Sequence, residues 1–243
     1  AFKGTTRRTA LQIAEEIDFY GAYMMPEYSY DQSSIALYTL SKHASKVLPI
    51  VKDVLCNSTV PEAELQTYIR NNKQSLQISM QKNDFVARKM FYNNVFGNSR
   101  YGITPTTAAY NNITREQLLT LYKQQFQPQN CTLIVAGNID DDLINQLKGL
   151  FVDDWNAADN ASLTKDFVQV PFLPEFLLEE KPDALQSAIR LGVPTINRIH
   201  PDFPAFQFVN CLFGGYFGSR LMRNIREEKG YTYSIGSAIA SLK

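Results

Sequence analysis

The chain has 243 residues, 44% hydrophobic and 12% aromatic, which is typical of a globular protein with a substantial core and argues against disorder. Lys and Arg (24) balance Asp and Glu (24), which excludes a global electrostatic field that would attract nucleic acid or an anionic membrane. No run of roughly 18 apolar residues occurs, so we expect no helix that crosses a bilayer. Three cysteines without a CxxC spacing fit neither a disulfide framework nor a thiolate zinc site.

Apolar periodicity predicts the elements of the first half of the chain. Helical spacing indicates helices over residues 8–20, 44–56, 61–80, 85–95, 114–121 and 140–150, the fifth of them opened by a capping box at Thr114 to Gln117. Two apolar bursts around residues 23–25 and 35–38, separated by polar turn residues, predict a pair of strands. The short apolar run 131–136, closed by Gly137, predicts a further strand.

A polar stretch from about residue 153 to residue 165 marks the predicted domain boundary. We therefore expect a first domain over residues 1–155 and part of a second over residues 165–243. In the second part the patterns predict strands over 186–193 and 231–239 and helices over 202–213 and 219–229. Strands mixed with long helices that do not alternate strictly favour an α+β fold with an antiparallel sheet.

One stretch of the second part suggests a binding site. Arg226 stands near the end of a predicted helix, Gly230 ends it, and Tyr233 opens the next predicted strand. This order places a guanidinium and a phenol side by side, where they can hold a peptide carbonyl. The structural alternative has about even weight: Arg226 interacting with the helix dipole and Tyr233 as an ordinary cross-strand aromatic.

The same stretch resembles the closing segment of the second domain in the pitrilysin/insulinase family of zinc peptidases, which includes the processing peptidases. Segments in matching order extend the resemblance over nearly the whole chain: Ala1 to Thr5 with the helix around Ala14 to Ile17, Tyr101-Gly102, Ile113 to Glu116, Thr132 to Asp140, Phe213 to Gly215, Ser219 to Leu221 and Arg226 to Tyr233. The resemblance implies the LuxS/metallohydrolase-like fold of that family, zinc as the cofactor of its active members, and substrate binding by Arg226 and Tyr233. The family's inverted HxxEH motif would fall just before Ala1, so we expect the chain to be a fragment that lacks the leading strands and the zinc motif.

The resemblance also tests the metal site. Catalytic zinc needs three protein ligands and a neighbouring carboxylate base, and the family's third ligand is a Glu on a later helix. Counting from Pro61 puts that ligand at Ser75, and a supporting carboxylate aligns near Tyr68. Residues 66–81 contain no Asp or Glu, so even an intact upstream motif would leave the site one anion short. The chain is thus predicted to be catalytically degenerate, with no catalytic residues and no metal of its own.

His43 and His200 are the only imidazoles. Neither has a His, Cys, Asp or Glu three or four residues further along the chain, so we expect neither histidine to bind a metal. Gly214-Gly215 favours a tight turn over close approach to a ligand by about three to one.

Three functions remain open. The first is a noncatalytic homologue that contributes cavity wall and peptide contacts to an active partner chain or an active half of the same protein. The second is a zinc endopeptidase whose HxxEH lies upstream and whose third ligand is not Ser75. The third is a scaffold similar to the core subunits of the respiratory cytochrome complex. The sequence predicts no cellular location.

Overall fold

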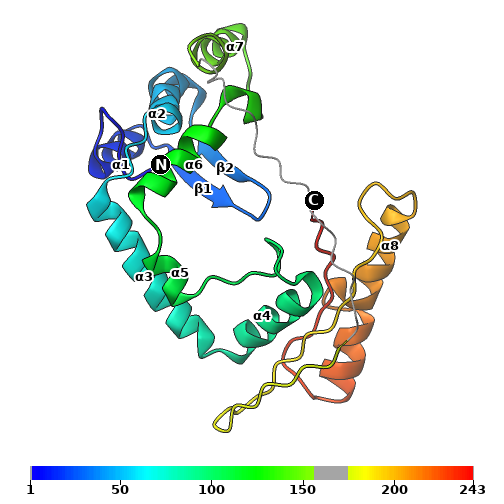
Figure 1. Cartoon of the computed structure of the whole chain (residues 1–243). Helices are drawn as coiled ribbons and strands as arrows, with labels where there is room; N and C mark the ends of the chain where they lie inside the picture. Colours follow the sequence, from blue (N-terminus) through cyan, green and yellow to red (C-terminus); the bar gives the residue numbers. More distant parts are fainter. Residues whose placement is uncertain (1, 156–174, 243) are drawn as a thin grey trace. The chain divides into compact units, whose positions relative to one another are not determined.

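The computed structural model describes residues 2–155 and 175–242, which fall into two compact units (Figure 1). The first unit contains the described residues up to Trp155 together with Glu175–Arg190, and the second contains the described residues from Leu191 onward. Most of the predicted domain boundary lies outside the described residues. The limits 1–155 and 165–243 therefore stay predictions.

The first unit is mostly helical, with one antiparallel hairpin. Its elements in chain order are α1 (Ala10–Phe19), β1 (Tyr23–Tyr28), β2 (Ser33–Tyr38), α2 (Ala44–Cys56), α3 (Glu62–Met80), α4 (Asn83–Phe96), α5 (Thr107–Asn111), α6 (Arg115–Gln125) and α7 (Asp141–Lys148). The sequence patterns predict all of them except the short α5. The antiparallel hairpin among the helices agrees with the expected α+β fold.

The core of the first unit forms where α1 and α2 pack on the hairpin. Ile13 and Ile17 of α1 meet Val47, Ile50 and Val54 of α2, all of them buried. Partly buried side chains of both strands cover this cluster: Met24, Ile35 and Leu37. Antiparallel pairing runs from Tyr23 opposite Tyr38 to Tyr28 opposite Ser33. The apolar stripe predicted for residues 8–20 is therefore the face of α1 that contacts the core.

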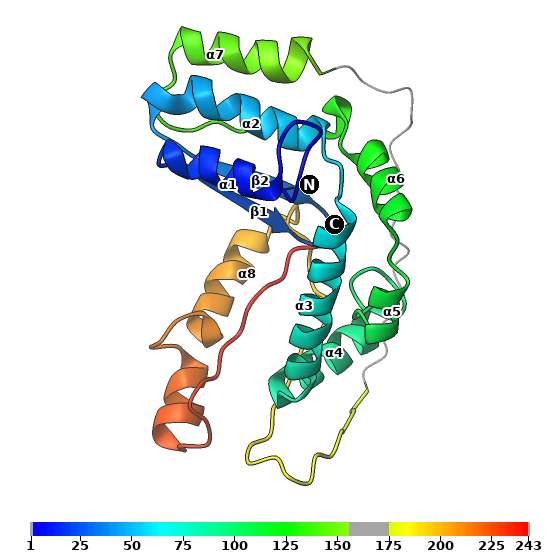
Figure 2. The same ribbon diagram turned by 90° about the vertical axis from the view of Figure 1, so that its left-hand side faces the viewer.

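A second layer forms on the other side of α2. Ala44 and Leu48 pack against Leu147 of α7, so that α7, α2 and α1 lie one above another (Figure 2). The chain leaves α7 through a π-helical turn, η3 (Gly149–Asp153). Lys52 of α2 donates to the carbonyl of Leu150 and lies near the rings of Phe151 and Trp155.

Hydrogen bonds from other segments fix both ends of α3, the helix that carries Ser75. At its start, Arg115 of α6 donates from Nε to the Val60 carbonyl and from Nη2 to the Thr59 carbonyl, both at 2.8 Å. At its end, Lys181 donates to the Gln81 carbonyl at 2.9 Å. The predicted capping box is confirmed, because the Thr114 side chain accepts from the Gln117 backbone and Gln117 returns a bond to the Thr114 N–H.

The second unit contains α8 (Phe203–Asn210), which continues into the π-helical η4 (Cys211–Gly215), and a helical run that includes the π-helical η5 (Met222–Glu228). Both agree in position with predicted helices. The chain then runs extended, and the N–H of Ser237 donates to the Gly214 carbonyl at 3.0 Å. A Cβ on Gly214 would lie 2.6 Å from the Ser237 nitrogen, so this glycine permits backbone to pass close by. The close approach is thus to the chain's own backbone, and the tight turn expected at Gly214-Gly215 stays a prediction.

Three predicted strands are not formed in the described residues. Segments 131–136, 186–193 and 231–239 carry no ladder hydrogen bonds there, although their side chains are apolar at strand spacing. A strand needs a neighbour to accept and donate its backbone bonds, and a sequence pattern does not report whether that neighbour is at hand. No helix in the described ranges is long and apolar enough to cross a membrane.

Candidate functional site

Ser75 lies exposed on α3. The acidic residues of that helix are confined to its first turn, at Glu62 and Glu64. Tyr68, two turns before Ser75 and half exposed, has a raised pKa because of partial burial and, to a smaller extent, the phenols of Tyr28 and Tyr110. The family resemblance predicts carboxylates at the positions of Ser75 and Tyr68. This surface instead carries the hydroxyl of Ser75 and a group of phenols.

The donors on this surface do not fit zinc. A catalytic zinc site takes anionic carboxylates or imidazoles, and a neutral serine supplies neither. Within residues 2–155 and 175–242, no three side chains of His, Cys, Asp or Glu come together in a way that could hold a metal ion. The expectation that this chain holds no zinc stays a prediction.

The two histidines have structural surroundings. The ring of His43, at the start of α2, lies 5.4 Å from the ring of Tyr20. His200 Nδ1 accepts a hydrogen bond from the Asp202 N–H at 3.1 Å, just before α8. Both rings therefore serve local packing or turn geometry in this structure.

The second unit brings Arg226 and Tyr233 close together. The guanidinium carbon of Arg226 lies 5.9 Å from the centroid of the Tyr233 ring and 4.9 Å from that of Phe217. Both distances fall within the range of cation–π attraction. Tyr233 is 92% exposed and Phe217 67% exposed, so the rings hold the guanidinium from the solvent side of the fold.

Local backbone geometry creates this arrangement. Arg226 stands in the last turn of η5, whose widened π-helical winding is a feature often found at functional sites. Gly230 then takes a positive φ of 63°, which reverses the chain and returns Tyr233 toward the helix. The sequence pattern of helix, glycine and aromatic residue predicts this proximity, whereas the part played by Phe217 was missed because it precedes the helix.

Arg226 keeps its hydrogen-bonding capacity free. No ion pair or side-chain hydrogen bond of Arg226 occurs within the part of the chain that the structure describes. A guanidinium carries five N–H donors at its edge, and stacking against rings occupies only its faces. The edge is therefore available to a carbonyl or carboxylate oxygen. Binding of substrate by Arg226 and Tyr233 stays a prediction.

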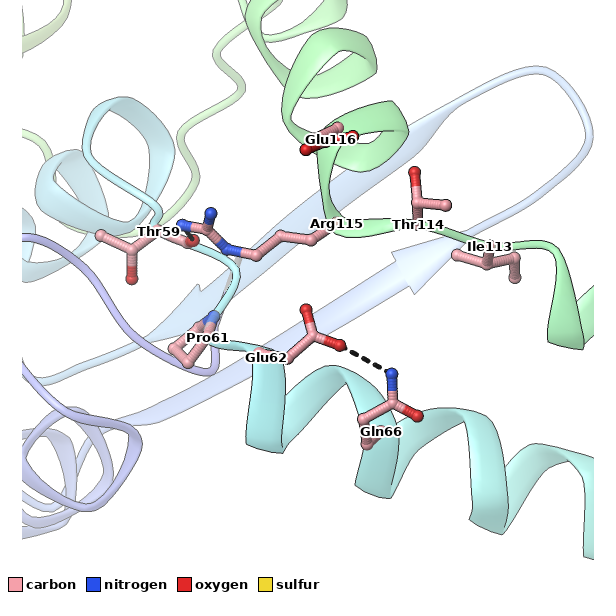
Figure 3. A pocket seen from close by; sticks show the side chains of 8 residues that line it. All are labelled: Thr59, Pro61, Glu62, Gln66, Ile113, Thr114, Arg115 and Glu116. Carbon is pink, nitrogen blue, oxygen red and sulfur yellow. Dashed lines mark hydrogen bonds between the residues drawn. The ribbon is translucent and has the colours of Figure 1, made fainter.

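A pocket in the first unit is a weaker candidate for a binding site. It has a volume of about 840 Å³ and opens between the starts of α3 and α6, lined by Thr59, Pro61, Glu62, Gln66, Ile113, Thr114, Arg115 and Glu116 (Figure 3). Its polar groups are largely engaged: Gln66 donates to Glu62 at 2.7 Å, and Arg115 is bound to the carbonyls of Thr59 and Val60. The guanidinium holds Val60 at a φ of 45°, unusual for a β-branched residue. Arg115 thus fixes a strained loop.

Comparison with known proteins places the chain. The model of the "Peptidase M16 inactive domain" matches residues 112–243, more than half of the sequence. The chain belongs to the peptidase M16 family. This is the insulinase/pitrilysin family, and the resemblance drawn from the motifs is confirmed.

M16 relatives from bacteria and humans support the assignment. A Rickettsia felis protein named "Uncharacterized zinc protease" is 30% identical over 98% of this chain and 57% of its own length. The human mitochondrial-processing peptidase subunit beta is 25% identical over 89% of this chain and 44% of its own length. The chain thus spans about half the length of these relatives. Several bacterial relatives carry the name "Uncharacterized zinc protease", so zinc is the cofactor of the family.

A solved M16 structure supports the fold. The peptidase M16 inactive domain from Pseudomonas fluorescens matches with a TM-score of 0.76 and 19% identity, covering 99% of this chain and 59% of that one. At this identity the likeness concerns the fold alone. It agrees with the α+β, insulinase-like class expected from the sequence.

Proposed function

We propose that this chain is a noncatalytic part of an M16 protein that contributes peptide contacts to an active partner chain or an active half. The proposal rests on the contrast between two surfaces of the chain, one around Ser75 and the other around Arg226. The Ser75 surface lacks the anions that zinc needs, whereas Arg226 remains free beside two exposed aromatic rings. Holding a peptide needs the second surface and not the first.

The names of similar proteins are compatible with a divided site. The human relative is described as a subunit, and one solved M16 neighbour is described as the first half of a periplasmic protease from Escherichia coli. In such an arrangement a metal on one part acts on a peptide that another part helps to hold. We infer that this chain supplies the holding part, with Arg226 donating to a peptide oxygen and Tyr233 packing beside it.

The test measures zinc, cleavage and peptide binding on the same preparation. We expect zinc well below one equivalent after dialysis, no chelator-sensitive cleavage of a fluorogenic peptide, and saturable binding of a labelled peptide by fluorescence anisotropy. The Arg226→Gln variant should weaken that binding roughly tenfold, because a charge-assisted hydrogen bond is lost.

The Ser75→Glu variant serves as the matched metal control. One carboxylate on α3 still lacks the other ligands, so we expect it to gain neither zinc nor cleavage. Stoichiometric zinc together with chelator-sensitive cleavage by the unaltered chain would overturn the proposal and favour an active zinc endopeptidase. Absence of any peptide binding would instead favour a scaffold.

A further inference from the structure

The segment Glu175–Arg190 is attached to the first unit along α4, and we call it the strap. Asn94, in the last turn of α4, donates from Nδ2 to Glu175 Oε2 at 2.8 Å. Asn83, the first residue of α4, donates from Nδ2 to the Gln186 carbonyl. The strap is thus attached at both ends of α4, in the direction opposite to that of the helix.

Lys181, near the middle of the strap, makes the third attachment. Its ammonium donates to the Gln81 carbonyl at 2.9 Å and to the Met80 carbonyl at 3.5 Å, at the C-terminal end of α3. The last carbonyls of a helix have no partner inside the helix and carry the negative end of its dipole, so an ammonium stabilises them. Lys181 thus caps α3 from a position 100 residues beyond Gln81.

A turn in the strap fixes the backbone of Lys181. The Ala184 N–H donates to the Lys181 carbonyl at 3.0 Å, which closes a turn with Pro182 in its second position. Proline suits that position because its ring sets the φ angle that the turn needs. The lysine backbone is therefore ordered locally, and attachment of the ammonium to α3 costs mainly the freedom of the side chain.

The strap buries almost no apolar surface. Every residue in it except Lys181 and Ala188 is exposed, and its large apolar side chains include Phe176 at 86% and Leu185 at 100%. Burial of apolar surface is the main force that holds a segment in place, and exposed hydrogen bonds add little because water competes for the same groups. Segments with few buried contacts open at a lower free energy than the fold as a whole. The strap therefore opens without unfolding of the unit.

We propose that the strap is a releasable tether, held closed chiefly by Lys181. The strap ends at Arg190, and the described part of the second unit begins at Leu191. Release adds the whole strap to the free chain in front of the second unit, up to roughly 50 Å when extended. Release also removes the cation from the last carbonyls of α3, which loosens the last turn of that helix. One contact thus controls both the length of the tether and the order at the end of α3.

Limited proteolysis of the 243-residue chain measures release. A Glu-specific protease cuts after Glu179 or Glu180 when a stretch of chain around them is free. Lys181→Met keeps the apolar stem and loses the ammonium, so we expect cleavage at these sites to become roughly tenfold faster. Exchange of the Gln81 and Lys82 N–H groups, which close the last turn of α3, should also become faster by hydrogen-exchange mass spectrometry.

Two further variants serve as controls. Lys181→Arg retains a positive charge and N–H donors, so it should behave like the unaltered chain. Lys82→Met removes an exposed lysine of the same corner, whose side chain makes no hydrogen bond or ion pair within the described residues, and should change neither cleavage nor exchange. Circular dichroism shows whether each variant keeps its helices.

Urea separates release of the strap from unfolding of the unit. A released strap exposes little new surface, so cleavage after Glu179 or Glu180 should be nearly constant in urea below the unfolding transition, whereas cleavage after Glu15 in α1 should rise steeply.

Three results would overturn the inference. A steep rise of strap cleavage with urea would show that the strap opens only when the unit unfolds. Equal cleavage of Lys181→Met and the unaltered chain would show that Lys181 does not hold the strap. Cleavage of the unaltered chain as fast as that of a synthetic peptide of residues 175–190 would show that the strap is not closed. None of these measurements depends on peptide binding by Arg226, so the proposed function is tested separately.

Discussion

Asp53 illustrates how single residues in the first unit are held. Its side chain, on α2, is 3% exposed and accepts from Thr5 Oγ1 and Arg8 Nη1 at 2.7 Å and from Asn57 Nδ2 at 2.8 Å. Burial alone would raise the pKa of Asp53, but the hydrogen bonds from Thr5, Asn57 and Arg8 and the charge of Arg8 lower it below the ordinary value. The ionised carboxylate therefore ties the N-terminal segment to α2.

We expect the Asp53→Asn variant to have a free energy of unfolding roughly 3 kcal/mol lower at pH 7, because a buried ion pair loses one partner. A carboxylate whose pKa is depressed on folding contributes fully above the unfolded value of about 3.9 and loses that contribution as pH falls through the folded value. The difference between the two proteins should therefore shrink below about pH 4. Urea unfolding between acid and neutral pH measures it.

Glu15→Gln, an exposed position on α1, is the control for that series. It should change the free energy of unfolding by less than about 0.5 kcal/mol at any pH. A difference between the native and Asp53→Asn proteins that stays constant down to the acid limit would contradict the depressed pKa.

Residue identity predicted the candidate site only in part. Ser75 and Arg226 could be singled out because each occupies a position in an ordered motif, and the structure shows one exposed on α3 and the other beside Tyr233. Phe217 and the contacts of Thr5 and Arg8 with Asp53 could not, because they join side chains that no helical or strand period relates. Whether Ser75 and Arg226 have the predicted roles is a matter for the binding and metal experiments.

At the scale of elements, local pattern predicts helices well and strands poorly. The capping box of Thr114 and Gln117 predicts the start of α6, and the apolar stripe of α1 predicts that helix. The hairpin β1–β2 was predictable because its partner follows within a few residues. Segments 131–136, 186–193 and 231–239 depend on more distant pairing, which local periodicity cannot express.

The junction of α2 and α7 provides the prediction at this scale. Lys52 donates to the Leu150 carbonyl, and its nitrogen lies 5.5 Å from the ring centroid of Trp155, the single tryptophan. We expect Lys52→Met to keep the apolar stem but to lower the free energy of unfolding by roughly 1–2 kcal/mol, because a charged hydrogen bond and cation–π contacts are lost.

Trp155 is 9% exposed, so its fluorescence reports the same junction. The emission maximum should move to longer wavelength in Lys52→Met as the ring becomes hydrated. Lys46, an exposed lysine of the same helix, makes no ion pair or side-chain hydrogen bond within the described residues, so Lys46→Met should leave both stability and emission unchanged. An unshifted emission with unchanged stability in Lys52→Met would show that the junction rests on Leu147 packing alone.

For the whole molecule, charge balance and exposed apolar surface act together. The chain has a formal net charge of zero at pH 7 and a pI of about 7.0, so mutual repulsion between molecules is weakest near neutrality. Extended segments without ladder partners expose large apolar side chains, among them Ile134 at 85%, Ile189 at 84% and Leu191 at 93%. Extended apolar backbone of this kind is a template for pairing with another chain.

We therefore expect self-association of the isolated chain to be greatest near pH 7 and to decline on either side as net charge grows. Ile134→Lys adds a charge to segment 131–136, and it should lower both the sedimentation-derived association and the binding of a hydrophobic dye at pH 7. Because Ile134 is already exposed, the free energy of unfolding of the Ile134→Lys variant should differ from that of the unaltered chain by less than about 0.5 kcal/mol.

Gln129→Lys adds the same charge at an exposed polar position, which separates the effect of charge from that of lost apolar surface. Equal suppression of association by both variants would assign the effect to net charge, whereas suppression by Ile134→Lys alone would assign it to strand pairing through segment 131–136.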